Sequence, residues 1–380
     1  MRAAGPARGE HRDTLSNIQC LRFVAALLVV LFHAGAYLPY GGHQRGALFE
    51  AAALTGFGGV DIFFVISGFI MAWTTRQASG AGDAQRFLRR RVARIYSGYW
   101  PFCLIYLAAF WFTGPARLEG VDMAGSFSLW PTPVGELLIS VSWTLVFEMY
   151  FYVLFALLIA IMGRRREALL PALFCAFLAW TAYSVFVRGA YTPAAFEQMS
   201  KYEVYWASPY LLQFLAGALA AQWLHTRRAG PAWPYLALGL LLWVAAGYLN
   251  AAVFDGGLTR GDRVPWRVLI FGAPALVLLI GLVRLEFAGV VIAPRWSVLL
   301  GGASYALYLS HPVLLYLAQR LGGLNRSLTG STDLVAQGAY LLLVVLIVLL
   351  STAHYRAIER PLHRLFRRLL RTDTHHSGGG

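Results

Sequence analysis

Charged residues are scarce in this sequence. Only 13% of its 380 residues are charged, whereas 58% are hydrophobic, and soluble globular domains carry about 25% charged residues. A soluble protein with so few charges would expose large apolar surfaces, and a disordered chain would need far more polar sequence. The composition therefore excludes both classes and predicts a polytopic membrane protein.

Lysine is almost absent, since Lys201 is the only one among 32 basic residues. The net charge of +14 comes from arginines, most of which stand in short segments between apolar runs. This placement is typical of membrane topology and not of a nucleic-acid-binding face. We therefore expect membrane lipids as partners and no nucleic acid.

Cysteine is also rare. The three cysteines, Cys20, Cys103 and Cys175, all fall within apolar runs and form no C-x-x-C pair. This pattern argues against a disulfide framework and against a zinc site. We expect no metal in the protein.

Long apolar runs are what the sequence does contain. A membrane-spanning helix needs about 20 apolar residues, and the runs are continuously apolar instead of alternating, which predicts helices and not a β-barrel. The fold class is therefore all-α, a polytopic membrane protein with about ten transmembrane helices. The ten predicted spans are 18–38, 57–75, 97–114, 143–162, 168–188, 207–224, 234–253, 267–284, 297–320 and 335–357.

The distribution of arginine predicts the direction of the spans. With a cytoplasmic N-terminus, the inner segments carry more than twice as many basic residues as the outer ones, and an even number of spans puts both termini on that side. We expect a cytoplasmic tail at 1–17, a membrane domain at 18–357 and a basic cytoplasmic tail at 358–380. Arginine and leucine alternate at helical spacing in 360–372, which predicts an amphipathic helix on the anionic inner leaflet.

Ionisable side chains inside a span are costly and are functional candidates by default. Two carboxylates, Asp61 and Glu148, fall well inside predicted spans, as do His33 and His311. Arg22 is the one arginine placed within the first turns of a span. These five residues are the first candidates for a site.

Arg22 and His33 are eleven residues apart, which places them on one face of a helix with a rise of about 16 Å between them. A slot between them would suit a long ligand with an anionic head and a reactive tip, such as acyl-coenzyme A. In the alternative interpretation, Arg22 reaches the inner headgroups and His33 is a satisfied core histidine.

The alternating direction of the spans places Asp61 and Glu148 at about the depth of His33. A histidine and two carboxylates at one depth could form a proton-transfer centre in which a carboxylate orients the imidazole. Alternatively, the two carboxylates pair with buried donors and hold helices together.

Six short motifs carry a family resemblance, and they occur in order along the chain. They are CLRFVAALLVVLFH (20–33), GGVDIFFVISGFIM (58–71), RFLRRRVARIYSGYWP (86–101), SWTLVFEMYFYVLFAL (142–157), SYALYLSHP (304–312) and ERPL (359–362). Together they resemble the bacterial membrane acyltransferase-3 family, in which the third motif is a basic R-x-x-R loop. WTLVFEM and FGAPA (271–275) resemble the exopolysaccharide-acetylating branch, whereas Ser97 stands where many members have proline.

The resemblance implies an O-acyltransferase, expected to be an O-acetyltransferase, in the bacterial inner membrane. The donor would be cytoplasmic acyl-coenzyme A (acetyl-coenzyme A), and the acceptor an exopolysaccharide, another surface glycan or a lipid-linked precursor. Polysaccharide-assembly proteins are candidate partners.

By the same resemblance, His33 would be the catalytic base or the acyl acceptor, assisted by Glu148, with Asp61 in the same centre. Arg22, Arg91 and Arg94 would bind the donor. Tyr305 and His311 could also have a role in the site. Alternatively, Tyr305 is a packed tyrosine and His311 is a helix-capping histidine.

Two other classes remain as alternatives. A proton-coupled transporter could use Asp61, His33 and Glu148 as a relay, and a non-catalytic scaffold would leave the buried charges unexplained. A nucleophilic serine at Ser67 is not expected because the G-x-S-x-G elbow is missing. Ser67 and Gly68 instead suit a close approach of two helices.

Overall fold

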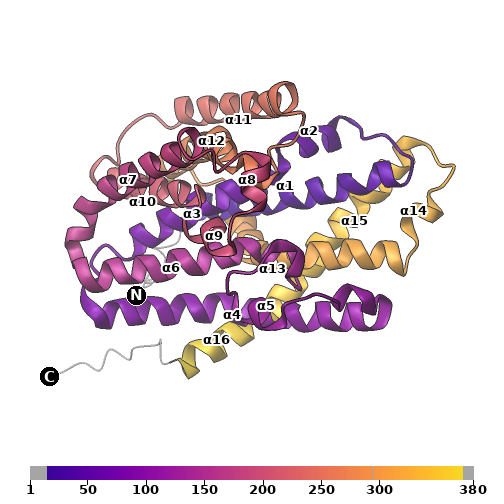
Figure 1. Cartoon of the computed structure of the whole chain (residues 1–380), viewed down its shortest axis with the longest axis horizontal. Coiled ribbons are helices and arrows are strands. Elements are labelled where there is room, and N and C mark those ends of the chain that lie inside the picture. The colour runs from indigo at the N-terminus through magenta and orange to yellow at the C-terminus, as the bar shows by residue number, and fades with distance from the viewer. Residues whose placement is uncertain (1–14, 293, 371–380) are drawn as a thin grey trace, which may run out of the picture.

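Every regular element in the described part of the chain is a helix. The computed structural model describes residues 15–292 and 294–370, and its long helices run mostly along the longest axis of the molecule (Figure 1). The all-α prediction is therefore confirmed. The expected tails at 1–14 and 371–380 lie outside the described residues.

A long helix covers all or most of each of the ten predicted spans. These helices are α1 (Ser16–Tyr40), α3 (Gly59–Thr74), α4 (Gly80–Thr113), α6 (Trp143–Met162), α7 (Arg166–Phe186), α10 (Tyr210–Thr226), α11 (Trp233–Phe254), α12 (Val264–Phe287), α13 (Pro294–Arg320) and α15 (Asp333–His354). Shorter helices join or flank them: α2 (Ala47–Thr55), α5 (Met123–Ser128), α8 (Pro193–Glu197), α9 (Lys201–Trp206), α14 (Leu324–Ser327) and α16 (Arg360–Leu369).

By length and apolar composition, eight helical stretches of the described residues are able to cross a membrane. One of these stretches, Ser140–Phe186, contains both α6 and α7, whereas α10 has only 17 residues. The count of ten spans, and their direction, remain predictions.

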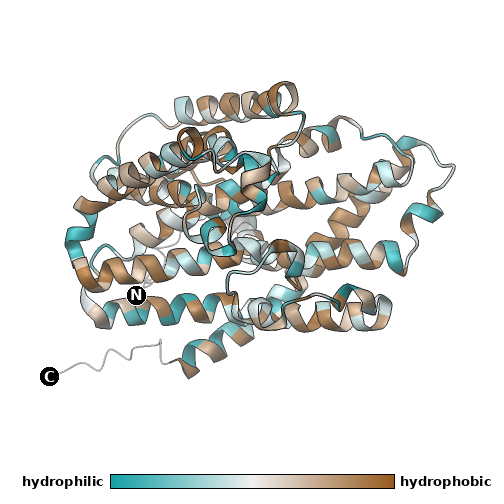
Figure 2. Cartoon of the chain, viewed as in Figure 1, coloured by the Kyte–Doolittle hydropathy of each residue, from teal (hydrophilic) through white to brown (hydrophobic). Residues whose placement is uncertain are grey.

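The outer helices have the surface expected next to lipid. Only 22% of the most apolar part of α11 is buried, and 28% of the corresponding part of Asp333–Leu369. Figure 2 shows hydrophobic residues along the lengths of the long helices and hydrophilic residues in the connections and on α16. Apolar helices left this exposed are stable only where hydrocarbon surrounds them.

The interior is formed by the helices that carry the candidate residues. α1 packs against α13 and α3, and α3 packs against α10. Gly68 on α3 and Gly217 on α10 make the last contact possible, because a Cβ on either residue would overlap the main chain of the other helix. The predicted close approach at Gly68 is therefore confirmed, whereas the Ser67 hydroxyl donates to Glu148 Oε1 at 3.2 Å.

The structure corrects the expectation of a basic loop. The segment 80–96 belongs to α4, which continues without interruption through Pro101 to Thr113. Alanine, arginine and leucine between Gly82 and Pro101 favour helix, and arginine density alone does not end one. The R-x-x-R motif is therefore presented by a helix.

The predicted amphipathic helix of the C-terminal tail is present as α16. It packs against α4, where the rings of Trp100 and Phe366 lie 5.8 Å apart, centroid to centroid. Four arginines of α16 are exposed: Arg360, Arg364, Arg367 and Arg368. Its contact with the inner leaflet remains a prediction.

We expect Gly217→Ala to lower the melting temperature in detergent by several degrees. The added methyl group meets the main chain of α3, and overpacking of this kind costs about 1–3 kcal/mol. Gly338→Ala is the matched control, because a Cβ on that α15 residue meets no atom within 4 Å. Equal melting temperatures for the two variants would contradict the described α3–α10 contact.

Candidate functional site

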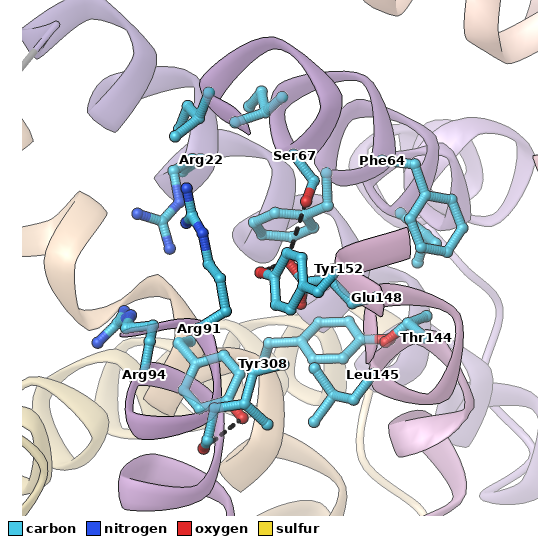
Figure 3. A pocket seen from close by; sticks show the side chains of 16 residues that line it. Arg22, Phe64, Ser67, Arg91, Arg94, Thr144, Leu145, Glu148, Tyr152 and Tyr308 are labelled. Atoms are coloured by element: carbon cyan, nitrogen blue, oxygen red, sulfur yellow. Dashed lines mark hydrogen bonds between the residues drawn. The ribbon is translucent and has the colours of Figure 1, made fainter. Parts of the chain in front are cut away.

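A pocket of about 130 Å³ lies among α1, α3, α4, α6 and α13. Its lining combines three arginines and a carboxylate with apolar and aromatic side chains (Figure 3). The lining residues are Arg22, Val60, Phe63, Phe64, Ile66, Ser67, Ile70, Arg91, Arg94, Ile95, Thr144, Leu145, Glu148, Tyr152, Tyr305 and Tyr308. Five of the eight predicted site residues line this pocket, whereas Asp61, His33 and His311 do not.

The three predicted donor-binding arginines, Arg22, Arg91 and Arg94, lie together at one side of the pocket (Figure 3). Arg22 donates to Gln19 Oε1 at 3.2 Å, and Arg91 lies over the ring of Tyr152 at 5.4 Å from its centroid. Among the described residues, neither Arg22 nor Arg91 forms an ion pair with a carboxylate. Two cationic groups of the pocket are thus left without a protein counter-ion.

Arg94 differs from the other two arginines because it has a carboxylate partner. Its Nη1 lies 2.6 Å from Oε1 of Glu359, a side chain with no exposed surface. Glu359 stands in the π-helical turn Tyr355–Glu359 between α15 and α16, and its Oε2 has no partner among the described residues. Glu359 was not predicted to be a buried charge, because it falls just beyond the last apolar run, although it begins the ERPL motif.

Glu148 lies inside the pocket, facing the arginines (Figure 3). Its Oε1 accepts hydrogen bonds from the Tyr152 hydroxyl at 2.7 Å and from the Ser67 hydroxyl at 3.2 Å. The expected partner, His33, does not contribute a hydrogen bond to this carboxylate. Glu148 is thus held by its own helix and by α3, in the same pocket as the three arginines.

Asp61 is a fully buried partner of Arg267. Arg267 Nε and Nη2 lie 3.0 and 2.9 Å from Asp61 Oδ2, and Gln213 Nε2 donates to Oδ1 at 2.7 Å. Both carboxylate oxygens are therefore occupied, and the pair joins α3 to α10 and α12. Arg267 is the first residue of the predicted span 267–284 and was not among the candidate residues, but it lies buried in α12.

His33 and His311 meet between α1 and α13. His33 Nδ1 lies 3.2 Å from His311 Nε2 and 2.9 Å from the carbonyl oxygen of Val29. His311 is completely buried, and its Nδ1 lies 3.3 Å from the carbonyl oxygen of Leu307. Two histidines from separate sequence motifs thus form one pair, which the spacing of either motif did not indicate.

The histidine pair is separated from the pocket by aromatic side chains. Phe63 and Tyr308 line the pocket, and the ring of Tyr308 lies 5.9 Å from those of both Phe63 and His311. The Tyr308 hydroxyl donates to the carbonyl oxygen of Val141 at 3.1 Å. The expected open slot from Arg22 to His33 is therefore interrupted, because α3 and α13 insert rings that the spacing on α1 does not reveal.

Tyr305, a further predicted site residue, lies in the pocket. Arg94 stands over its ring at 5.4 Å from the centroid, and its hydroxyl donates to the carbonyl oxygen of Ile95 at 3.1 Å. It is thus both a lining residue and a packed tyrosine.

Within the described residues, no group of three or more histidines, cysteines and carboxylates is arranged to hold a metal ion.

Comparison with known proteins agrees with the motif pattern. The model of an acyltransferase domain, the acyltransferase-3 family, matches residues 15–356. The chain is 30% identical to the exopolysaccharide production protein ExoZ of Rhizobium meliloti (strain 1021), over 83% of this chain and 94% of the relative. It is 26% identical to the acyltransferase MdmB of Streptomyces mycarofaciens, over 93% of each chain.

No solved structure matches the chain significantly. The family model spans most of the chain, all ten long helices begin within it, and the motifs that line the pocket fall inside it. The chain therefore belongs to the acyltransferase-3 family and is a multi-pass membrane O-acyltransferase.

Proposed function

We propose that the protein moves an acetyl group from cytoplasmic acetyl-coenzyme A to a hydroxyl of an exopolysaccharide, another surface glycan or a lipid-linked precursor. The observation that carries this proposal is the convergence of Arg22, Arg91 and Arg94 on one pocket beside a histidine pair. The reaction would take place in the bacterial inner membrane.

The chemistry of the pocket supports coenzyme A as the donor. Guanidinium groups match phosphate oxygens through paired, charge-assisted hydrogen bonds, and Arg22 and Arg91 have no carboxylate that would compete for them. The aromatic and aliphatic remainder of the lining suits the pantetheine arm, since small-molecule sites are mostly apolar with a few placed polar groups.

His33 is the proposed base. It takes the proton of the acceptor hydroxyl while the oxygen bonds to the acyl carbon; the carbon–sulfur bond then breaks, and the departing thiolate receives the proton from His33. Because Phe63 and Tyr308 separate His33 from the pocket, their side chains have to rotate for the thioester to reach it. Glu148, on the donor side, orients Ser67 and Tyr152 along the wall of the pocket.

The proposed class of acceptor is inferred from the name of a relative. The Rhizobium meliloti protein is named for exopolysaccharide production, and the alignment covers nearly all of its length. An exopolysaccharide or its precursor is therefore the first acceptor to test, with polysaccharide-assembly proteins as partners that would deliver it.

A proton-coupled transporter finds less support. Such a relay needs a carboxylate that gains and loses a proton, and Asp61 is held by Arg267 and Gln213. We propose that Asp61 contributes to the enzyme by holding α3 against α12.

We expect His33→Ala to lower acetyl transfer by about 100-fold or more, the usual contribution of a positioned base. The measurement is transfer of radiolabelled acetyl groups to isolated exopolysaccharide by the purified protein in nanodiscs. His43→Gln is the control, since His43 pairs with Asp333 away from the pocket. Full activity of the His33 variant would overturn the proposed role.

We expect Arg91→Gln to raise the KM for acetyl-coenzyme A by about tenfold, because one charge-assisted hydrogen bond is worth about 1.5–3 kcal/mol. Its melting temperature should stay unchanged, since Arg91 has no ion pair to lose.

Arg94→Gln should raise the KM and also lower the melting temperature, because Glu359 would be left buried and unpaired at a cost of about 3–5 kcal/mol. The double variant Arg94→Gln/Glu359→Gln should recover the melting temperature but not the KM. An unchanged KM in both single variants would contradict donor binding at these arginines.

A further inference from the structure

We infer that His311 is the positioning residue for His33: it accepts the Nδ1–H of His33 and stabilises the imidazolium that forms during transfer. A second histidine thus takes the part that the sequence analysis assigned to Glu148. The inference rests on the proposed role of His33 as the base.

The tautomer of His33 follows from its main-chain contact. Its Nδ1 lies 2.9 Å from the carbonyl oxygen of Val29, which can only accept a hydrogen bond. In the neutral ring Nδ1 therefore carries the proton, and Nε2 keeps the lone pair that a base requires.

His33 Nε2 is also accessible. Among the described residues, no hydrogen bond reaches this nitrogen. The ring nitrogens of His225 and His354 are buried without a partner, whereas His33 Nε2 does not belong to that group. The lone pair of His33 is thus open to an acceptor hydroxyl.

The same reasoning assigns the proton of His311. Its Nδ1 lies 3.3 Å from the carbonyl oxygen of Leu307, so Nδ1 carries the proton and Nε2 carries the lone pair. This Nε2 lies 3.2 Å from His33 Nδ1. The Nδ1–H of His33 is therefore shared between the Val29 carbonyl and His311 Nε2.

The arrangement offsets part of the cost of placing a charge on His33 among packed helices. Once Nε2 has taken a proton, Nδ1–H of the imidazolium still has two acceptors, and hydrogen bonds to a charged group are worth about 1.5–3 kcal/mol. The two carboxylates considered from the sequence are bound elsewhere, Asp61 to Arg267 and Glu148 to Tyr152. His311 is completely buried, so water does not replace it as the acceptor.

The test compares two variants at position 311. His311→Gln keeps an amide oxygen near the position of Nε2, whereas His311→Met fills similar space without a strong acceptor. We expect His311→Met to lower kcat by about 100-fold with the KM for acetyl-coenzyme A within twofold of wild type. The kcat of His311→Gln should be at least about tenfold higher than that of His311→Met, because the glutamine restores a hydrogen bond to a charged group.

A substitution of the neighbouring residue, Ser310, serves as the packing control. Ser310→Ala removes the buried hydrogen bond to Ser351 from the same helix and should leave kcat within twofold of wild type. Melting temperatures of all variants report on folding. Because residues that act as a unit are not additive, His33→Ala/His311→Met should be no slower than His33→Ala.

Each outcome separates the two proposals. If His33→Ala is inactive but His311→Met keeps wild-type kcat, or if the Gln and Met variants lose the same activity, the role of His311 is overturned while that of His33 stands. If His33→Ala remains fully active, the proposed function of His33 fails, and the inference on His311 fails with it.

Discussion

A charge buried among apolar helices needs a partner of opposite charge. This constraint divides the charged residues inside the protein into those with a partner in the chain and those without one. Asp61 pairs with Arg267, and Arg94 pairs with Glu359, each in a contact that joins helices far apart in the sequence. Arg22 and Arg91 have no carboxylate partner. Both are partly buried, and a partly buried cation without a counter-ion is costly, so their position beside a pocket is best explained by an anionic ligand.

The site is divided along α1. Arg22 contributes to the pocket, whereas His33 lies eleven residues further on, beyond Phe63 and Tyr308. In the proposed mechanism, a donor bound at the arginines would be kept apart from His33, the proposed base, until these aromatic side chains move. Such a separation would limit hydrolysis of the thioester by water, since the reacting groups meet only when the donor is in place.

The family motifs predicted most of the pocket. Arg22, Arg91, Arg94, Glu148 and Tyr305 all line it. The partners of these residues were harder to predict, because a hydrogen bond joins positions hundreds of residues apart: Arg94 meets Glu359, and His33 meets His311. Arg267 stands at the edge of the predicted span 267–284, and the edge of a hydrophobic run says little about which residues a neighbouring helix covers.

The amino-acid sequence by itself determined the class of the protein, the positions of its long helices and the family to which it belongs. These properties follow from local composition and from short motifs. Only the tertiary structure decided that α4 carries the R-x-x-R motif, that Asp61 is neutralised by Arg267, and that His33 faces a histidine and not a carboxylate. Those outcomes depend on how helices pack against one another, and packing is set by side chains on both partners at once.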